Sequence, residues 1–367
     1  MTRRPASDRE AMVTDVEVTR PPKQRMDGTR ITVGIPTFNR ADLLREAIES
    51  VLGQTYRNFR LIVSDNASTD ETQAVVASVS DARLEYVRAD KNIGMIGNFN
   101  RVIELTETEF LMLLPDDDRL YPDYLRSVVD VLQRNPRVGL VHTAFDEIDI
   151  ESRVQKYEVS YVKSSHPLMV EPGDAFIERS MTSTAILLSS TTYRTRAIRE
   201  AGGMTTLEEP FADVPLFMRI AQNWDIAYLD RPLVGFRVHD QTETVRLAPR
   251  GQTEADARDR HLTYGRIMFD RRMGFLDEAG LPSGETSKYR SLATLRFVSD
   301  RAGLGAAPWL QTWAAFVEIV RLYPRILTYP IAWRFIVAQF GGRAVRRTMY
   351  RLASAVLEIR HASSFRT

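Results

Sequence analysis

The chain has 367 residues, of which 44% are hydrophobic and 26% charged, and its formal net charge is +1. These values are ordinary for one large or two moderate globular domains, and they exclude a protein defined by its overall charge, so nucleic acid is not an expected partner. The absence of cysteine excludes disulfides, thiolate metal sites and thiol nucleophiles. Any chemistry must come from carboxylates, hydroxyls, the backbone and five histidines.

The N-terminal segment carries no targeting signal that we can identify. Residues 1–28 are polar and lack an apolar stretch of signal-peptide length, so we expect a disordered lead-in there. No stretch of the chain reaches the roughly eighteen uncharged apolar residues of a membrane-spanning helix. The sequence therefore predicts a cytoplasmic protein.

Residues 30–145 alternate apolar strand patterns with amphipathic helix patterns. Strands are expected at 30–37, 59–65, 84–90, 109–115 and 138–145, and helices at 39–54, 68–79, 98–105 and 122–134. Asn39 is expected to cap the first helix, and the sequence STDE at 68–71 is a capping box that opens the second. Four strand–helix alternations predict a doubly wound α/β domain.

Polar side chains follow three of these strands, namely Thr37 and Asn39, Asp65 and Asn66, and Asp116–Asp118. Ligands of such a sheet bind outside the carboxyl ends of its strands, so these groups are predicted to share one edge. The aspartate triplet either caps the next helix or binds a hard divalent cation, Mg²⁺ or Mn²⁺, and the apolar strand before it favours the cation. Asp65 either forms a turn or contacts a bound base or ribose.

Two nucleotide-binding signatures are missing after the first strand. There is no GxGxxG, which disfavours a dinucleotide-binding Rossmann site, and no GxxxxGK[ST] phosphate loop.

Five segments together resemble family 2 glycosyltransferases of the GT-A fold: VGIPTFNR, SVLGQTY, LIVSDNASTDET, KNIGMIGNFN and LMLLPDDDRLYPDYL. The resemblance is close over residues 30–145 and continues more thinly to residue 245. It implies an α/β fold with a mixed sheet flanked by helices. It also implies a nucleotide-sugar-binding half at 29–145 and an acceptor-binding half at 146–245. The resemblance does not cover residues 246–367, for which we expect a helical, basic extension.

The resemblance implies an inverting transferase that moves a sugar from a nucleoside diphosphate sugar, usually a UDP-sugar, to an acceptor hydroxyl, with Mn²⁺ or Mg²⁺ as cofactor. By motif position, the nucleotide and donor sugar would be bound by Pro36, Thr37, Asn39, Asp65, Asn92, Gly94 and Asp116. Asp117 would bind the metal, and Asp118 is either a second ligand or a cap of the turn. Pro115 stands where the family often has an acid.

The acceptor half would supply the catalytic base. The resemblance implies Asp213 in this role, with Ala212 in place of the family's glutamate and with Glu208 and Glu209 as substitutes; the alternative for Asp213 is a helix N-cap. His239 either contacts the metal and diphosphate or is structural, and Arg237 is a weaker phosphate partner. His142 lies within an apolar strand and is expected to belong to the core.

The C-terminal segment from Arg321 to Thr367 carries nine arginines, one acid and many aromatic and aliphatic residues. This pattern fits a helix on an anionic membrane surface, such as the inner face of the plasma membrane, and equally a basic face packed on the protein or a second subunit. A membrane contact would suit a lipid-linked or cell-envelope glycan acceptor.

Two other functions stay open. One is a sugar-phosphate nucleotidyltransferase, which PTFNR disfavours because that class has a Gly- and Arg-rich loop there. The other is a non-catalytic relative that only binds nucleotide sugars.

Overall fold

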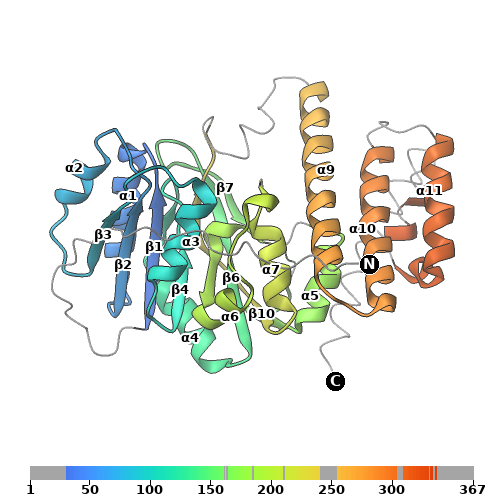
Figure 1. The fold of residues 1–367 in the computed structure, drawn as a ribbon, viewed down its shortest axis with the longest axis horizontal. Helices are drawn as coiled ribbons and strands as arrows, with labels where there is room; N and C mark the ends of the chain where they lie inside the picture. The colour runs from blue at the N-terminus through green and yellow to red at the C-terminus, as the bar shows by residue number, and fades with distance from the viewer. Residues whose placement is uncertain are drawn as a thin grey trace, which may run out of the picture.

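The computed structural model describes residues 30–160, 162, 164–183, 186–209, 211–239, 254–303, 309–329, 331–333 and 335–336. The expected lead-in and most of the basic C-terminal segment lie outside these residues. At the centre is a mixed sheet with the strand order β3-β2-β1-β4-β9-β6-β10-β5, while β7 pairs with β6 and β8 with β10 (Figure 1). The strands are β1 (Ile31–Thr37), β2 (Phe59–Asp65), β3 (Leu84–Arg88), β4 (Phe110–Leu113), β5 (Arg119–Leu120), β6 (Val138–Ile148), β7 (Val154–Val159), β8 (Leu168–Glu171), β9 (Thr191–Arg194) and β10 (Asp225–Arg237).

The sheet combines a parallel part with an antiparallel one. β1 runs parallel to both β2 and β4, and β2 runs parallel to β3. β9 lies antiparallel between β4 and β6, and β5 lies antiparallel to β10. The mixed sheet implied by the resemblance is thus confirmed, and its parallel part is the one that the alternating sequence pattern predicts.

Helices cover both faces of the sheet. They are α1 (Ala41–Leu52), α2 (Thr72–Ala77), α3 (Met95–Leu105), α4 (Tyr124–Arg134), α5 (Gly173–Ser180), α6 (Thr195–Glu200), α7 (Asp213–Ala221), α9 (Glu254–Glu278), α10 (Ser283–Gly303) and α11 (Trp309–Leu322), with 3₁₀ turns η1 (Leu188–Ser190), η2 (Thr206–Glu208) and η3 (Pro324–Thr328). Successive residues of β4 join different apolar clusters, because strand side chains point alternately to the two faces. Met112 packs in the cluster of α1 and α4, and Leu113 in that of α3, α6 and α7.

The C-terminal helices extend the second of these clusters. Phe275 of α9, Leu292 of α10 and Phe316 of α11 are buried in the same apolar cluster as α3 and α7. Figure 1 shows α9–α11 beyond α5 and α7, at the end of the molecule away from β3. A helical C-terminal region is therefore confirmed over the described residues. Within those residues, no helix is both long and apolar enough to cross a membrane.

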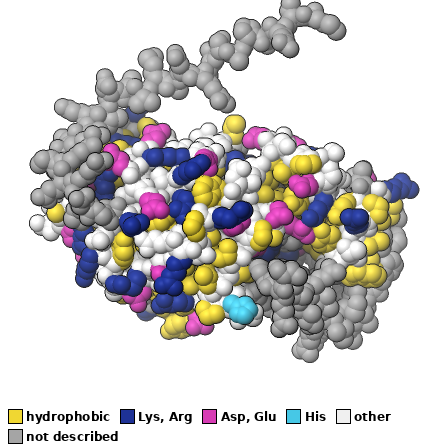
Figure 2. Space-filling model, turned by 90° about the horizontal axis from the view of Figure 1, so that it is seen from below, with side chains coloured by type: hydrophobic (Ala, Val, Ile, Leu, Met, Phe, Trp, Pro, Cys, Tyr) yellow, Lys and Arg dark blue, Asp and Glu magenta, His cyan; other side chains and the backbone are white. Residues whose placement is uncertain are grey.

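The described surface mixes charges of both signs. Figure 2 shows lysine and arginine side chains interspersed with aspartate and glutamate over the visible face. This distribution agrees with the net charge of +1.

Three local expectations need correction. Asn39 has a left-handed φ of 52° and does not cap α1, which begins at Ala41 after Arg40. The STDE segment does not form a capping box, since α2 begins only at Thr72 and Glu71 precedes it. The aspartate triplet leads into the short strand β5 and not into a helix, which removes the helix-capping alternative.

One buried amide joins α3 to the two central parallel strands. Asn98 accepts a hydrogen bond from Ser64 Oγ at 2.6 Å, and its amide nitrogen donates to Ser64 O at 2.8 Å and Thr37 O at 3.4 Å. Its side chain thereby fixes the carboxyl ends of β1 and β2.

We expect Asn98→Ala to lower the free energy of unfolding by about 1–3 kcal/mol, because it leaves buried polar groups of Ser64 without a partner. Urea denaturation at neutral pH measures this. Arg134→Ala is the control, since its ion pair with Asp130 is largely exposed and is worth at most about 1 kcal/mol. Equal effects of the two substitutions would contradict a structural role for Asn98.

Candidate active site

The carboxyl ends of β1, β2 and β4 meet at one edge of the sheet. The parallel register sets Thr37 beside Asp65, and Asn66 N donates to Thr37 O at 2.9 Å. Thr37 Oγ1 donates to Asp116 Oδ2 at 2.7 Å. The expected gathering of polar groups from three strand ends is confirmed, and Pro36 and Thr37 supply its buried floor.

Asn39 ties the turn after β1 to the turn after β2. Its backbone N–H donates to Ser68 Oγ at 2.9 Å, and its Oδ1 accepts from the N–H of Thr69 at 2.7 Å. The left-handed backbone at Asn39 allows both contacts, because asparagine tolerates this conformation better than most residues. Its side chain therefore shapes the site.

Asp65 is fully buried and both of its oxygens are engaged. Oδ1 accepts from the N–H of Ser68 at 2.9 Å, while Oδ2 accepts from Tyr86 Oη at 2.5 Å and lies 3.3 Å from Arg88 Nε. Because the side chain is 0% exposed, a nucleotide base could contact Asp65 only if the surrounding turn moved.

The loop that contains Asn92 and Gly94 is fastened by Asn66. Asn66 Nδ2 donates to Asn92 Oδ1 at 2.9 Å, and Asn66 Oδ1 accepts from the N–H of Ile93 at 2.8 Å. Gly94 has a φ of 81°, which suits glycine, and its N–H donates to Asn92 Oδ1 at 2.8 Å. Asn92 and Gly94 thus lie beside the end of β2. Asn66, which the sequence does not single out as a binding residue, holds them there.

Asp116 and Asp117 form a buried carboxylate pair that is bridged by a cation from the chain itself. Arg40 Nη1 lies 3.2 Å from Asp116 Oδ1 and 2.6 Å from Asp117 Oδ2. Burial, together with the charge of Asp117, raises the pKa of Asp116 to about 6. Arg40 is the last residue of the PTFNR motif. The motif could therefore have indicated that a cation lies near the aspartate pair.

His239, two residues after the end of β10, reaches the same carboxylate. Its Nε2 lies 3.2 Å from Asp117 Oδ2, the oxygen that Arg40 also contacts. Burial alone would raise the pKa of Asp117, but the hydrogen bond with His239 and the charges of Arg40 and His239 outweigh it and lower that pKa. Two predicted site residues, Asp117 and His239, are therefore brought together.

Asp118 points away from this pair. One oxygen accepts from the backbone N–H of Arg237 at 2.7 Å, and the other accepts from Ser189 Oγ. Burial and the charge of Asp117 raise the pKa of Asp118 well above its ordinary value. Both oxygens of Asp118 thus have partners within the protein, which agrees with the alternative that Asp118 caps its own turn.

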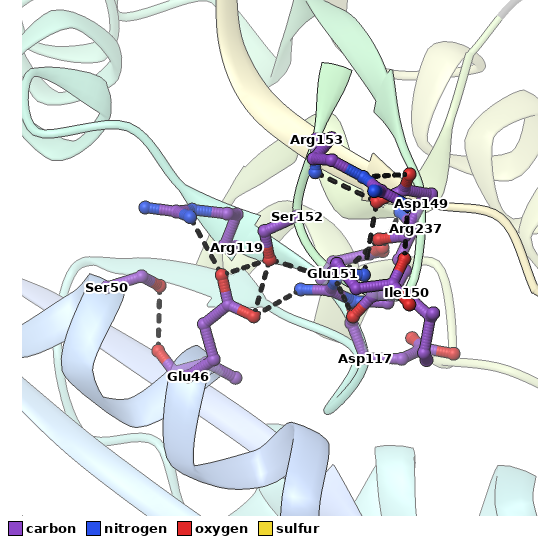
Figure 3. A network of polar contacts seen from close by, with 12 residues as sticks. Glu46, Ser50, Asp117, Arg119, Asp149, Ile150, Glu151, Ser152, Arg153 and Arg237 are labelled. Atoms are coloured by element: carbon purple, nitrogen blue, oxygen red, sulfur yellow. Dashed lines mark hydrogen bonds and ion pairs between the residues drawn. The ribbon is translucent and has the colours of Figure 1, made fainter. Parts of the chain in front are cut away.

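Arg237 is not placed for the phosphate contact that its motif suggested. Its side chain is 1% exposed, and its guanidinium donates to the backbone oxygen of Asp117 and to a carboxylate oxygen of Glu46 (Figure 3). All three of its guanidinium nitrogens have acceptors within the protein. A ligand could reach them only after the network had opened.

Asp213 is the first residue of α7. No hydrogen bond in the described part of the chain connects it to the Asp116–Asp118 turn. Its side chain is partly exposed, yet the surrounding protein excludes enough water to raise the pKa of Asp213 to about 6. Of its neighbours, Ala212 is buried and Glu209 is exposed. A pKa of about 6 suits the Asp213 carboxylate to accept a proton near neutral pH.

His142 lies within β6 and is 2% exposed. Burial lowers its pKa well below the ordinary value, so the imidazole is kept neutral. The expectation that it belongs to the core is confirmed.

The residues around Asp117 fit a hard cation that is shared with a ligand. No group of three or more His, Asp or Glu side chains placed to hold a metal ion occurs in the described ranges. Asp117 and His239 alone converge, and a cation such as Mg²⁺ commonly takes one or two protein ligands and completes its shell with substrate phosphates. The donor set fits that arrangement.

The comparisons with known proteins agree with this geometry. Residues 32–184 match the family model described as glycosyl transferase family 2. An uncharacterized glycosyltransferase of Rickettsia conorii is 26% identical over 223 residues, which cover 60% of this chain and 35% of that protein. The GalNAc(5)-diNAcBac-PP-undecaprenol beta-1,3-glucosyltransferase of Campylobacter jejuni is 34% identical over 116 residues, 31% of this chain and 36% of that protein. The chain thus spans about a third of the length of these relatives.

Among solved structures, the fold resembles residues 1–349 of S. aureus TarS in complex with UDP. The TM-score is 0.52 at 15% sequence identity, and the match covers 90% of this chain and 91% of that one. This likeness extends through the C-terminal helices and supports the GT-A architecture.

We expect Asp213→Asn to stabilise the protein at pH 7.5 by about 1–3 kcal/mol, because the native pKa of about 6 exceeds the ordinary 3.8. Above pH 6 the folded state bears the full cost of the charged carboxylate, and below pH 3.8 the group is neutral in both states. The gain should therefore be roughly halved at pH 5. Urea denaturation at both pH values measures it. Destabilisation that is equal at both would instead make Asp213 a structural helix-terminal group.

Proposed function

We propose that the chain, whose residues 32–184 match the glycosyl transferase family 2 model, is an inverting glycosyltransferase that uses a UDP-sugar donor. The observation that carries the proposal is the buried Asp116–Asp117 pair, bridged by Arg40 and met by His239 at the carboxyl edge of the parallel strands. Such an edge is where a sheet of this kind binds its ligand, and Arg40, together with a divalent cation held by Asp117, would supply positive charge for a bound diphosphate.

The nucleoside would lie over the turns after β1 and β2. Thr37, Asn39 and the loop at Asn92 and Gly94 are already cross-linked by hydrogen bonds, so this surface needs little ordering when a ligand binds. The UDP complex of the structurally similar TarS supports uracil as the base. Asp116, beside Thr37, would face the ribose or the sugar.

The diphosphate would be bound by Arg40 together with Asp117 and His239, which would hold Mn²⁺ or Mg²⁺. When bound, the metal neutralises the negative charge that develops on the departing diphosphate. Arg40 contributes to the same stabilisation, because its guanidinium lies 2.6 Å from Asp117 Oδ2 and 24% of its side chain is exposed. Asp118 serves the site by holding the turn.

Asp213 would take the proton from the acceptor hydroxyl as the new glycosidic bond forms. A carboxylate with a pKa of about 6 is largely ionised at pH 7.5 and still basic enough to assist the attack. Asp117 and Asp118 are engaged within the turn and are not available as nucleophiles. The reaction is therefore a single displacement that inverts the configuration at the sugar carbon, without a sugar–enzyme intermediate.

A lipid-linked or cell-envelope glycan is the proposed acceptor. The name of the Campylobacter jejuni relative includes an undecaprenol diphosphate carrier, which supports an acceptor of this kind. Within the C-terminal segment, Ile326 and Phe335 are buried in the apolar cluster of α9–α11. A contact with the inner face of the plasma membrane would therefore come from other residues of that segment. Family membership and the PTFNR turn disfavour the nucleotidyltransferase alternative, and the Asp117–His239 pair disfavours a relative that only binds nucleotide sugars.

We expect Asp117→Asn to lower kcat with a UDP-sugar by at least about 100-fold, since it removes the charged oxygen shared by Arg40 and His239. Nucleotide release from a panel of UDP-sugars with Mn²⁺ and a glycan acceptor measures this. Asp130→Asn on the exposed face of α4 is the matched control and should keep full activity. Full activity of Asp117→Asn, together with full activity in EDTA, would contradict the metal assignment.

We expect Asp213→Asn to lower kcat by about 100- to 10,000-fold while donor affinity changes less than about twofold, because a base acts only on the acceptor hydroxyl. In the wild type, kcat should fall below about pH 6, where Asp213 becomes protonated. The pH dependence of initial rates and titration with UDP measure the two effects. Loss of UDP binding in Asp213→Asn would argue against this role.

A further inference from the structure

The most heavily bonded charged group near the candidate site is Arg237, and its contacts are all within the protein. We propose that Arg237, paired with Glu46, is a positioning residue that fixes the Asp116–Asp118 turn so that Asp117 faces His239 and the diphosphate. This inference rests on the donor site proposed above. It assigns Arg237 a role that differs from direct phosphate binding.

The first support is the strand register between β5 and β10. Val234 pairs with Leu120 and Gly235 with Arg119, so continuing the antiparallel ladder by two residues sets Arg237 opposite Asp117. Arg237 is the last residue of β10, whereas Asp117 and Asp118 precede β5, so the contacts at this point involve side chains of Asp118 and Arg237. β10 therefore reaches the aspartate turn as an extension of the sheet.

The second support is the pair of contacts that Arg237 makes with this turn. Its backbone N–H donates to Asp118 Oδ1 at 2.7 Å, and its Nε donates to the backbone oxygen of Asp117 at 2.7 Å. His239, two residues further along the chain, meets Asp117 Oδ2 at 3.2 Å. The same short segment thus holds the backbone of Asp117 and also presents a side chain to its carboxylate.

The third support is the far side of the guanidinium, which two other elements hold (Figure 3). Nη2 donates to Glu46 Oε2 at 2.5 Å, on α1. Nη1 lies 2.7 Å from the backbone oxygen of Asp149, 3.1 Å from that of Ile150 and 3.0 Å from Ser152 Oγ, in the turn between β6 and β7. The planar fork is therefore fixed from three directions, which a lysine cannot reproduce.

Glu46 is the anionic centre of this network. It also accepts from Arg119 Nη1 at 2.8 Å and from Ser152 Oγ at 2.6 Å. Gly235 permits the approach of Arg119, because a Cβ at that position would lie 2.9 Å from the Arg119 side chain. Loss of the Glu46 charge should release the guanidinium and, through it, the backbone of Asp117.

The test compares Arg237→Lys and Glu46→Gln with the wild type in the full chain. Uridine binding, followed by NMR titration, reports the nucleoside surface, and UDP binding with and without Mn²⁺, followed by calorimetry, reports the diphosphate and metal region. We expect Mn²⁺-dependent UDP affinity to fall by about 10- to 100-fold, as for other residues that orient a metal ligand. Uridine affinity should change less than about twofold.

Arg153→Gln is the matched control. Arg153 lies in the same turn between β6 and β7 and pairs with Asp149 and Glu151, but it has no contact with the aspartate turn (Figure 3). Its substitution should leave all three affinities unchanged. If Arg237→Lys does not fold, as judged by circular dichroism, Glu46→Gln decides, because the 30% exposed Glu46 side chain is less demanding to replace.

Four results would overturn the inference. Unchanged Mn²⁺-dependent UDP affinity in folded variants would make the network purely structural. Equal loss of uridine and UDP affinity would indicate general damage to the site. Equal weakening of UDP binding with and without Mn²⁺ would indicate that Arg237 contacts the phosphates directly. A wild type that binds neither uridine nor UDP would instead remove the proposed donor site, and this inference with it.

Discussion

Three adjacent carboxylates at the end of a buried strand are the constraint on which the site depends. Two such charges about 4 Å apart repel each other by about 4 kcal/mol at an effective dielectric constant of 20. The structure balances each carboxylate differently. Asp117 is met by Arg40 and His239, Asp118 turns back to Ser189 and the backbone of Arg237, and Asp116 accepts from Thr37 with a pKa raised to about 6.

These partners come from different parts of the chain. Arg40 precedes α1, Ser189 lies in η1, Arg237 ends β10, and His239 follows two residues later. Removing one member of a buried charged network leaves another charge uncompensated, at a typical cost of about 3–5 kcal/mol. The aspartate turn therefore specifies how the N-terminal half of the sheet meets β10, and the contacts that organise the fold are also those that shape the site.

Much of this arrangement follows from local sequence patterns, and the rest depends on contacts across the chain. The apolar run before Asp116 predicts a buried strand. The polar residues after β1 and β2 predict a shared edge, because the carboxyl ends of parallel strands lie at the same edge of the sheet. The predictions that were wrong concern residues whose roles depend on contacts with distant parts of the chain. Asn39 resembles a helix cap by residue type, yet its turn is set by Ser68 and Thr69, about thirty residues away. The role of Arg237 depends on Glu46, 191 residues distant, and no local pattern contains that pairing.

Arg40 and Arg237 divide two tasks that a single arginine could not perform. The Arg237 side chain is 1% exposed and donates to three elements, so any movement would break several buried hydrogen bonds at once. The Arg40 side chain is 24% exposed and forms ion pairs with Asp116 and Asp117. In the proposed donor complex, a diphosphate would bring further negative charge to this edge, and the more accessible Arg40 would be the guanidinium that meets it. The Arg237 guanidinium preserves the geometry of the aspartate turn. The Arg40 guanidinium would compensate the additional negative charge when a ligand binds.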